Sequence, residues 1–265
     1  MSQFVSRVVV TLVALPVVLW LVWLGGGWLF GLALVAALIA LHELYVMARS
    51  LRPLVLAGYA GAIAALLGAW LGGPAWMLGG LALTLLLAFG LYGIAETRQS
   101  GTITIGSTVL GVAWIALGLG HLLLLRDLPE HGRLLLFTVL LAVFADDTAA
   151  YLVGRLLGRH KLAPSLSPAK TWEGFLAGTA AAVAVSFFAL YEQDFLDIPE
   201  SLALGAAIAI AGAAGDLFES ALKRDLQVKD SGRLLGGHGG MLDRIDALLF
   251  AGVAAFYVVL AFGYG

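Results

Sequence analysis

Long apolar segments, separated by short polar or glycine-rich breaks, dominate the sequence. A helix needs about 20 apolar residues to cross the hydrocarbon core of a bilayer. Windows of this length recur along the chain and end at glycine, proline or charged residues. The pattern predicts nine membrane-spanning helices, at residues 5–24, 27–47, 54–73, 75–94, 103–125, 133–157, 171–191, 201–222 and 243–263.

Two of these boundaries depend on glycine and proline alone. Gly25-Gly26-Gly27 separates the first two helices, and Gly72-Gly73-Pro74 separates the third from the fourth. Arg7 precedes the first apolar run, as in a signal peptide, but the run is long and no small-x-small cleavage site follows it. We therefore interpret it as a retained helix.

Composition supports a membrane protein. Hydrophobic residues make up 61% of the 265 residues and charged residues only 12%, whereas soluble domains carry about 25% charged residues. The absence of cysteine excludes disulfides and thiolate chemistry. We expect an all-α polytopic protein in which N-terminal helices (1–130) and a catalytic region (131–265) form one membrane unit. The lipid bilayer is an expected partner and nucleic acid is not.

The basic residues are distributed unequally between the two sides that nine helices define. One side receives 13 of the 15 basic residues, and the other receives only Arg126 and Arg133. Because basic loops stay in the cytoplasm, we expect the N-terminus and the even-numbered loops to be cytoplasmic. The two most basic loops, 155–170 and 223–244, then face the same compartment, and the expected location is a bacterial inner membrane.

The stretch 213–246 interrupts the apolar pattern with charges of both signs. Asp216, Ser220 and Lys223 share one helix face at i, i+4 and i+7, and Asp243 and Asp246 align at i, i+3. Three converging carboxylates repel one another unless a cation lies between them, and such hard oxygen ligands suit Mg²⁺. A helix N-terminus and the glycines of the turn 236–240 would favour a bound anion. The alternative is that these charges only cap and solvate a loop.

A second polar cluster lies between the sixth and seventh predicted helices. Asp146 and Asp147 are adjacent, and about 100° separates neighbours on a helix, so we expect at most one to face a site. Lys161 and Lys170 could neutralise phosphates. Alternatively, Ser167-Pro168 starts the seventh helix and the lysines anchor lipid headgroups.

One further acidic residue and two glycine pairs are interpreted as structural features. Glu43, next to His42, is read as a residue of the membrane interface rather than a ligand. The pairs Gly154/Gly158 and Gly174/Gly178 have the small-xxx-small spacing that allows close helix contact.

The run Ser220–Asp246, S-A-L-K-R-D-x4-K-D-S-G-x4-G-H-G-G-x-L-D-R-I-D, resembles the signature of the phosphatidate cytidylyltransferases, or CDP-diacylglycerol synthases. Upstream, Asp147-Thr-Ala-Ala-Tyr-x2-Gly-Arg and the segment 162–174 are similar to that family as well. The matching motifs cover roughly residues 145–247. Asp146, where the family pattern has a neutral residue, and Ala169, where a lysine is frequent, depart from it.

The resemblance implies transfer of a cytidylyl group from CTP to phosphatidic acid, with release of pyrophosphate. It implies Mg²⁺ as cofactor and leaves open a second cation and a homodimer. Asp216, Asp243 and Asp246 would hold the metal, with Ser220 and Lys223 completing the catalytic set. The expected substrate-binding residues are Asp147, Lys161, Ser167, Lys170, Arg224, Lys229, His238 and Arg244.

Three other functions remain open at this point. A CTP-dependent lipid kinase of the polyprenol type would transfer the terminal phosphoryl group instead. A CDP-alcohol phosphotransferase is disfavoured because Asp243-Arg-Ile-Asp246 lacks the continuation of that motif. A cation-coupled transporter would place its charges near the bilayer midplane and show inverted repeats, whereas these acids cluster at one predicted face.

Overall fold

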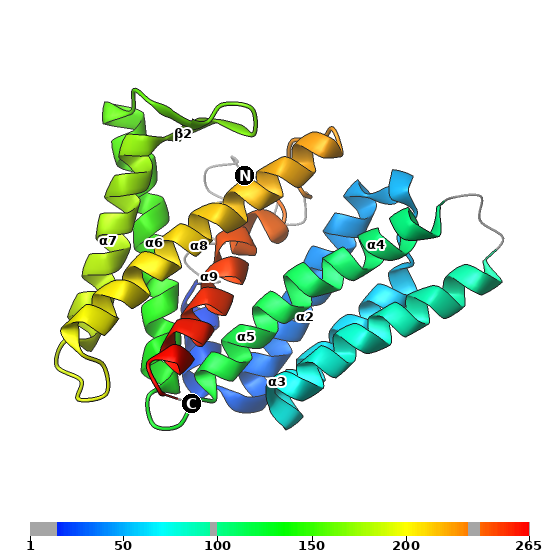
Figure 1. Cartoon of the computed structure of the whole chain (residues 1–265), viewed down its shortest axis with the longest axis horizontal. Coiled ribbons are helices and arrows are strands. Elements are labelled where there is room, and N and C mark those ends of the chain that lie inside the picture. Colours follow the sequence, from blue (N-terminus) through cyan, green and yellow to red (C-terminus); the bar gives the residue numbers. More distant parts are fainter. Residues whose placement is uncertain (1–14, 96–99, 233–238, 265) are drawn as a thin grey trace. The chain divides into compact units, whose positions relative to one another are not determined.

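The computed structural model describes residues 15–95, 100–232 and 239–264. Within these residues, seven helices are long and apolar enough to cross a membrane, which confirms an all-α, multi-pass membrane protein. The elements are α2 (Gly26–Met47), η1 (Arg49–Leu51), α3 (Val55–Ile94), α4 (Gly101–Gly111), the π-helix η2 (Val112–Ala116), α5 (Leu117–Arg126), α6 (Gly132–Leu157), β1 (Lys161–Ala163), β2 (Ser167–Thr171), α7 (Trp172–Leu190), α8 (Ile198–Asp225) and α9 (Leu242–Ala261) (Figure 1).

The chain forms two compact units. The first unit comprises Met1–Leu124 with Leu226–Ile245, and the second comprises Leu125–Asp225 with Asp246–Gly265. The division falls within the first turn of α9, so Asp243 belongs to the first unit and Asp246 to the second.

In the first unit, α3 is a hairpin of two helical halves. The helical geometry breaks at Gly73, where φ is 75° and ψ is −163°, just before Pro74. The halves pack closely: a side chain at Gly61 would collide with Thr84, and one at Gly80 would collide with the backbone of Ala65. The break predicted between the third and fourth spans is therefore confirmed, and α3 counts once among the seven helices although it contains two predicted spans.

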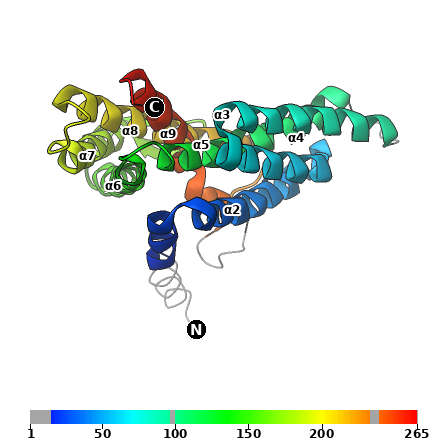
Figure 2. The same ribbon diagram turned by 90° about the horizontal axis from the view of Figure 1, so that it is seen from below.

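The boundary predicted at Gly25-Gly26-Gly27 is also present. Gly25 and Gly26 have φ values of 67° and 49°, in the left-handed region that glycine adopts readily. They separate the short apolar helix Leu15–Leu24 from α2, and Figure 2 shows the two helices meeting at a steep angle.

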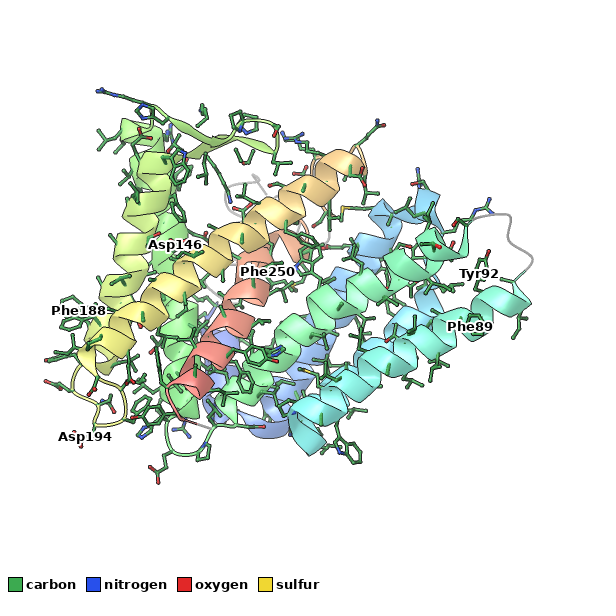
Figure 3. The ribbon with its side chains drawn as sticks, viewed as in Figure 1. Phe89, Tyr92, Asp146, Phe188, Asp194 and Phe250 are labelled. Atoms are coloured by element: carbon green, nitrogen blue, oxygen red, sulfur yellow. The ribbon has the colours of Figure 1, made fainter. Side chains whose placement is uncertain are left out.

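In the second unit, glycines allow α6 and α7 to approach closely. The Cα of Gly174 lies against Gly154, and Gly178 lies against Asp146, so the predicted small-xxx-small contacts are confirmed as contacts within this chain. Helix α7 packs in turn against α8. Apolar side chains such as Phe188, which is 71% exposed, point outward (Figure 3), as expected for a surface that faces lipid.

The segment between α6 and α7 contains the only strands in the described part of the chain, which the sequence analysis did not predict. β1 and β2 pair antiparallel, with Lys161 opposite Thr171. Thr171 then caps α7 by accepting a 3.2 Å hydrogen bond from the Gly174 amide. The alternative that Ser167-Pro168 starts the helix is therefore wrong, because these residues belong to β2.

The α3 hairpin gives a testable prediction about stability. Gly80→Ala would place a Cβ against the Ala65 backbone, and overpacking of this kind costs about 1–3 kcal/mol. Gly79→Ala is the matched control, because nothing lies within 4 Å of a Cβ at that position. We expect thermal unfolding in detergent, followed by tryptophan fluorescence, to show a lower midpoint for Gly80→Ala alone. Equal midpoints for the two variants would contradict the hairpin packing.

Candidate functional site

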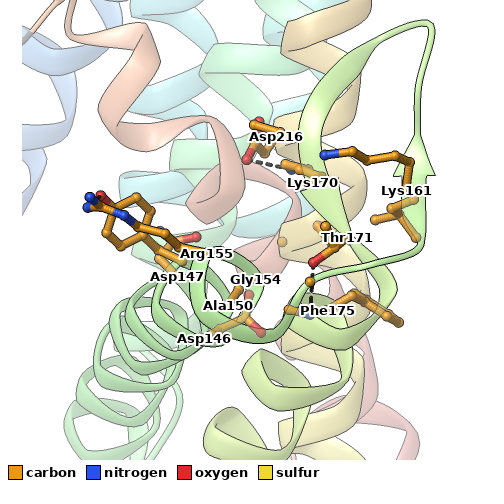
Figure 4. A pocket seen from close by; sticks show the side chains of 17 residues that line it. Asp146, Asp147, Ala150, Gly154, Arg155, Lys161, Lys170, Thr171, Phe175 and Asp216 are labelled. Carbon is orange, nitrogen blue, oxygen red and sulfur yellow. Dashed lines mark hydrogen bonds and ion pairs between the residues drawn. The ribbon is translucent and has the colours of Figure 1, made fainter.

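A cavity of about 560 Å³ opens in the second unit between α6, the β-hairpin, α7 and α8. Four of the predicted site residues, Asp147, Lys161, Lys170 and Asp216, line it together (Figure 4). Arg155 also lines it and was not predicted, although it belongs to the upstream Gly-Arg motif; it donates a 2.9 Å hydrogen bond to the Tyr151 hydroxyl. The cavity therefore gathers three basic side chains beside carboxylates.

An ion pair joins the hairpin to α8 at this cavity. Lys170 Nζ lies 2.5 Å from Asp216 Oδ2, and the two side chains are 23% and 35% exposed. The Ser220 hydroxyl approaches the other Asp216 oxygen at 3.5 Å, which confirms that Asp216 and Ser220 share a helix face. Lys170 and Asp216 are thus positioned by each other and remain accessible to a ligand.

Two further contacts hold the hairpin in place. The Glu173 carboxylate, in the first turn of α7, accepts hydrogen bonds from the amides of Arg159 and His160 at 3.1 and 3.2 Å. At the hairpin turn, Arg224 Nε of α8 donates to the Leu166 carbonyl at 3.3 Å. These contacts fix both ends of the hairpin, and Arg224 therefore has a contact that supports the hairpin in addition to its predicted phosphate role.

The sequence analysis expected at most one of the two adjacent acids of α6 to face a site, and the structure differs. Both Asp146 and Asp147 line the cavity. Asp146 is only 8% exposed and packs against Gly178, whereas Asp147 is exposed. The cavity wraps around this part of α6, so residues about 100° apart both reach it.

Lys223 has a partner that the sequence analysis did not identify. Its ammonium lies 2.6 Å from the carboxylate of Glu219, a residue that is only 2% exposed. The i, i+4 spacing was visible in the sequence and is typical of such pairs. Removing Lys223 would take the cationic partner away from a buried carboxylate, so a substitution there would test stability together with chemistry.

Asp246 lies beside Asp216 in the second unit. Gly215 packs on the backbone of Asp246, which brings Asp246 next to the turn of α8 that carries Asp216. A pair of carboxylates fits Mg²⁺, which typically takes one or two of them and completes its shell with waters and substrate phosphates. Among the residues that the structure describes, no three His, Asp or Glu side chains form a metal-binding group on their own.

In the first unit, two carboxylates contact the residues that precede α9. Asp243 accepts hydrogen bonds from the amides of Gly240 at 2.8 Å and Ser231 at 3.2 Å. Glu43 of α2 accepts from the amides of Met241 at 3.0 Å and Leu242 at 2.9 Å. Glu43 is 5% exposed, and the sequence analysis did not predict these contacts with backbone amides.

The remaining predicted residues do not line the cavity. Ser167 lies in β2, and Lys229 and Arg244 are exposed in the first unit. His238 lies outside the described residues. The roles of these residues stay predictions.

Comparison with known proteins identifies the family. A sequence profile of the Cytidylyltransferase family matches residues 5–262. The chain is 34% identical over 257 residues to the phosphatidate cytidylyltransferase of Staphylococcus haemolyticus, covering 92% of this chain and 93% of that protein. It is 36% identical over 159 residues to the Bacillus subtilis phosphatidate cytidylyltransferase, covering 60% and 59%.

A third relative is matched over a smaller share of its length. The phosphatidate cytidylyltransferase of Mycobacterium tuberculosis (strain H37Rv) is 38% identical over 161 residues, which is 58% of this chain and 47% of that protein. The chain thus spans about half the length of its mycobacterial relatives. Because the family profile and the Staphylococcus relative both cover most of the sequence, the chain belongs to the Cytidylyltransferase family.

Proposed function

We propose that the protein transfers the cytidylyl group of CTP to phosphatidic acid, forming CDP-diacylglycerol and releasing pyrophosphate. The observation that carries this proposal is the cavity in which Lys161, Lys170 and Arg155 meet Asp216, in a multi-pass membrane protein of the Cytidylyltransferase family. The names of its relatives support the same activity.

The reaction requires anions to meet. A phosphate oxygen of the lipid attacks the α-phosphorus of CTP, and the bond to the oxygen that bridges the α- and β-phosphates breaks, so pyrophosphate leaves. Catalysis then consists mainly of charge neutralisation and in-line positioning. Lys161, Lys170 and Arg155 would bind phosphate oxygens, and the lipid phosphate would need no dedicated base because it is already anionic near neutral pH.

The proposal includes Mg²⁺ held by Asp216 and Asp246, whose carboxylates supply the hard oxygen ligands that it prefers. When bound, the ion would neutralise charge on the transferring phosphate. The assignment of Asp243 as a further ligand, a second cation and a homodimer stay predictions from the sequence.

The distribution of basic residues supports a site on the cytoplasmic face of a bacterial inner membrane. CTP would enter from water while the acyl chains of phosphatidic acid remain in the bilayer. The hairpin with Lys161 and Lys170 belongs to one of the two most basic loops of the sequence.

The position of the transferred label tests the reaction class. Purified protein should incorporate label from the α-phosphate of CTP into a lipid product in the presence of phosphatidic acid and Mg²⁺. It should incorporate none from the γ-phosphate. Thin-layer chromatography of the extracted lipids measures both, and transfer of γ-label would establish the lipid-kinase alternative instead.

Substitution of Lys161 tests whether the basic side chains that line the cavity bind phosphate. A hydrogen bond to a charged group contributes about 1.5–3 kcal/mol, so Lys161→Ala should raise the KM for CTP about tenfold. The matched control is Arg159→Ala, which removes an equally exposed positive charge two residues away that does not line the cavity. Initial-rate kinetics should show less than a twofold effect for the control; equal effects would point to a general loss of surface charge.

Substitution of Asp216 tests whether its carboxylate takes part in the reaction. Asp216→Asn keeps the size of the side chain but removes the charge that pairs with Lys170, and we expect kcat to fall by about 100-fold or more. Because Asp216 is partly exposed, the variant should elute as a folded protein in size-exclusion chromatography. Asp194→Asn changes an exposed acid that lies outside the signature and does not line the cavity, and it should retain wild-type kcat. Substantial turnover by Asp216→Asn would remove this residue from the site.

A further inference from the structure

A buried carboxylate of α2 holds the residues that lead into α9. We call these residues, 231, 232 and 239–241, the α9 lead-in. Glu43 Oε1 accepts from the Met241 amide at 3.0 Å, and Oε2 accepts from the Leu242 amide at 2.9 Å and from the Ser231 hydroxyl at 3.3 Å. One side chain therefore contacts both ends of the lead-in, although it is almost 200 residues away in the sequence.

One of these donors, the Leu242 amide, is the first amide of α9, and the Met241 amide directly precedes it. The first amides of a helix have no partner within the helix, and here Glu43 supplies the acceptor that a local capping residue usually provides. Its negative charge also lies at the positive end of the helix dipole. Glu43 therefore fixes where α9 begins.

Glycine makes this approach feasible. A Cβ at Gly232 would overlap the Glu43 carboxylate, and a Cβ at Gly240 would overlap both Ser231 and Glu43. Gly239 has a φ of 81°, which favours glycine. The sequence analysis expected the glycines of the turn 236–240 to favour a bound anion. Residues 236–238 lie outside the described part of the chain, and Gly240 closely approaches Glu43.

The same network reaches Asp243. Ser231 donates its hydroxyl to Glu43 and its amide to Asp243 at 3.2 Å. The Gly240 amide, one residue before the amide that Glu43 binds, donates to Asp243 as well. The position of Asp243 therefore depends on the lead-in that Glu43 holds.

Helix α2 is a rigid support for Glu43. Leu41, Leu44 and Tyr45 are each at most 3% exposed, and the Tyr45 hydroxyl donates to the Thr108 carbonyl at 2.8 Å. A carboxylate is costly to bury, and a nearby Ser or Asp could cap a helix from within the segment. A local capping residue moves together with the helix that it caps. A cap from another, well-packed helix also fixes the start of α9 relative to α2.

We propose that Glu43 is a positioning residue for the transfer reaction: through the α9 lead-in it sets the place of Asp243 and of the first amides of α9. The proposal rests on the proposed function, because the sequence assigns Asp243 to that chemistry. Glu43 itself touches no substrate in this scheme.

Hydrogen exchange tests the contact without any assay of activity. In Glu43→Gln the amide offers one acceptor oxygen but turns an NH₂ group toward amide donors, and Glu43→Ala offers no acceptor. Mass spectrometry of the full chain in detergent should show at least tenfold faster exchange in peptides covering 239–246, with Ala above Gln. His42→Gln is the matched control: it changes the neighbouring residue, whose contact is with Tyr59, and should leave these peptides protected.

Kinetics then separate positioning from simple stabilisation. Measured per folded protein and well below the unfolding midpoint, kcat should fall about tenfold in Glu43→Gln and about 100-fold in Glu43→Ala, since small misplacements cost rates of this order. The KM for CTP should change less than twofold. A residue that only stabilises the fold would leave this normalised kcat unchanged.

The outcomes are distinguishable. Faster exchange together with a graded loss of kcat supports the proposal. Unchanged exchange, or faster exchange with wild-type kcat, overturns it. A wild-type chain that transfers no cytidylyl group would overturn the proposed function instead, while the exchange measurement would still decide whether Glu43 holds the lead-in.

Discussion

Carboxylates in a largely apolar helical protein require nearby donors or cations, because an uncompensated charge is costly to bury. This requirement organises the polar part of the structure. Asp216 pairs with Lys170 and Glu219 with Lys223, while Glu173 and Glu43 bind backbone amides. The contacts of Asp216, Glu173 and Glu43 each join two elements: the hairpin to α8, the start of the hairpin to α7, and the start of α9 to α2.

Close helix packing supplies the frame for these contacts. Gly154, Gly174 and Gly178 bring α6 and α7 together, and Gly215 brings α8 against the backbone of Asp246. Small residues let membrane helices associate where the hydrophobic effect gives little driving force. In the second unit the same glycines leave room for the cavity, whose walls include Gly154 and Gly174. Packing and ligand space therefore come from the same residues.

The sequence predicted what is encoded locally. Apolar windows located the helices, and Gly73 and Gly25 marked real breaks, because helix length and backbone conformation depend on nearby residues. The hairpin between α6 and α7 was missed since its anchors, Glu173 and Arg224, act from other elements. The contacts of Glu43 were missed for the same reason, because its donors are almost 200 residues away. The pairing of Glu219 with Lys223 was visible as an i, i+4 spacing but competed with the interpretation of Lys223 as a catalytic residue.

The Lys170–Asp216 pair links the electrostatics of the protein to its proposed reaction. The two side chains neutralise each other in the wall of the cavity. The proposed ligands carry the complementary charges, since a phosphate suits Lys170 and a divalent cation suits Asp216. Binding either ligand alone would leave one member of the pair without its counter-charge, whereas binding both together would leave neither unpaired. Under the proposed function, charge balance in this cavity would therefore favour a nucleotide that arrives together with its metal ion.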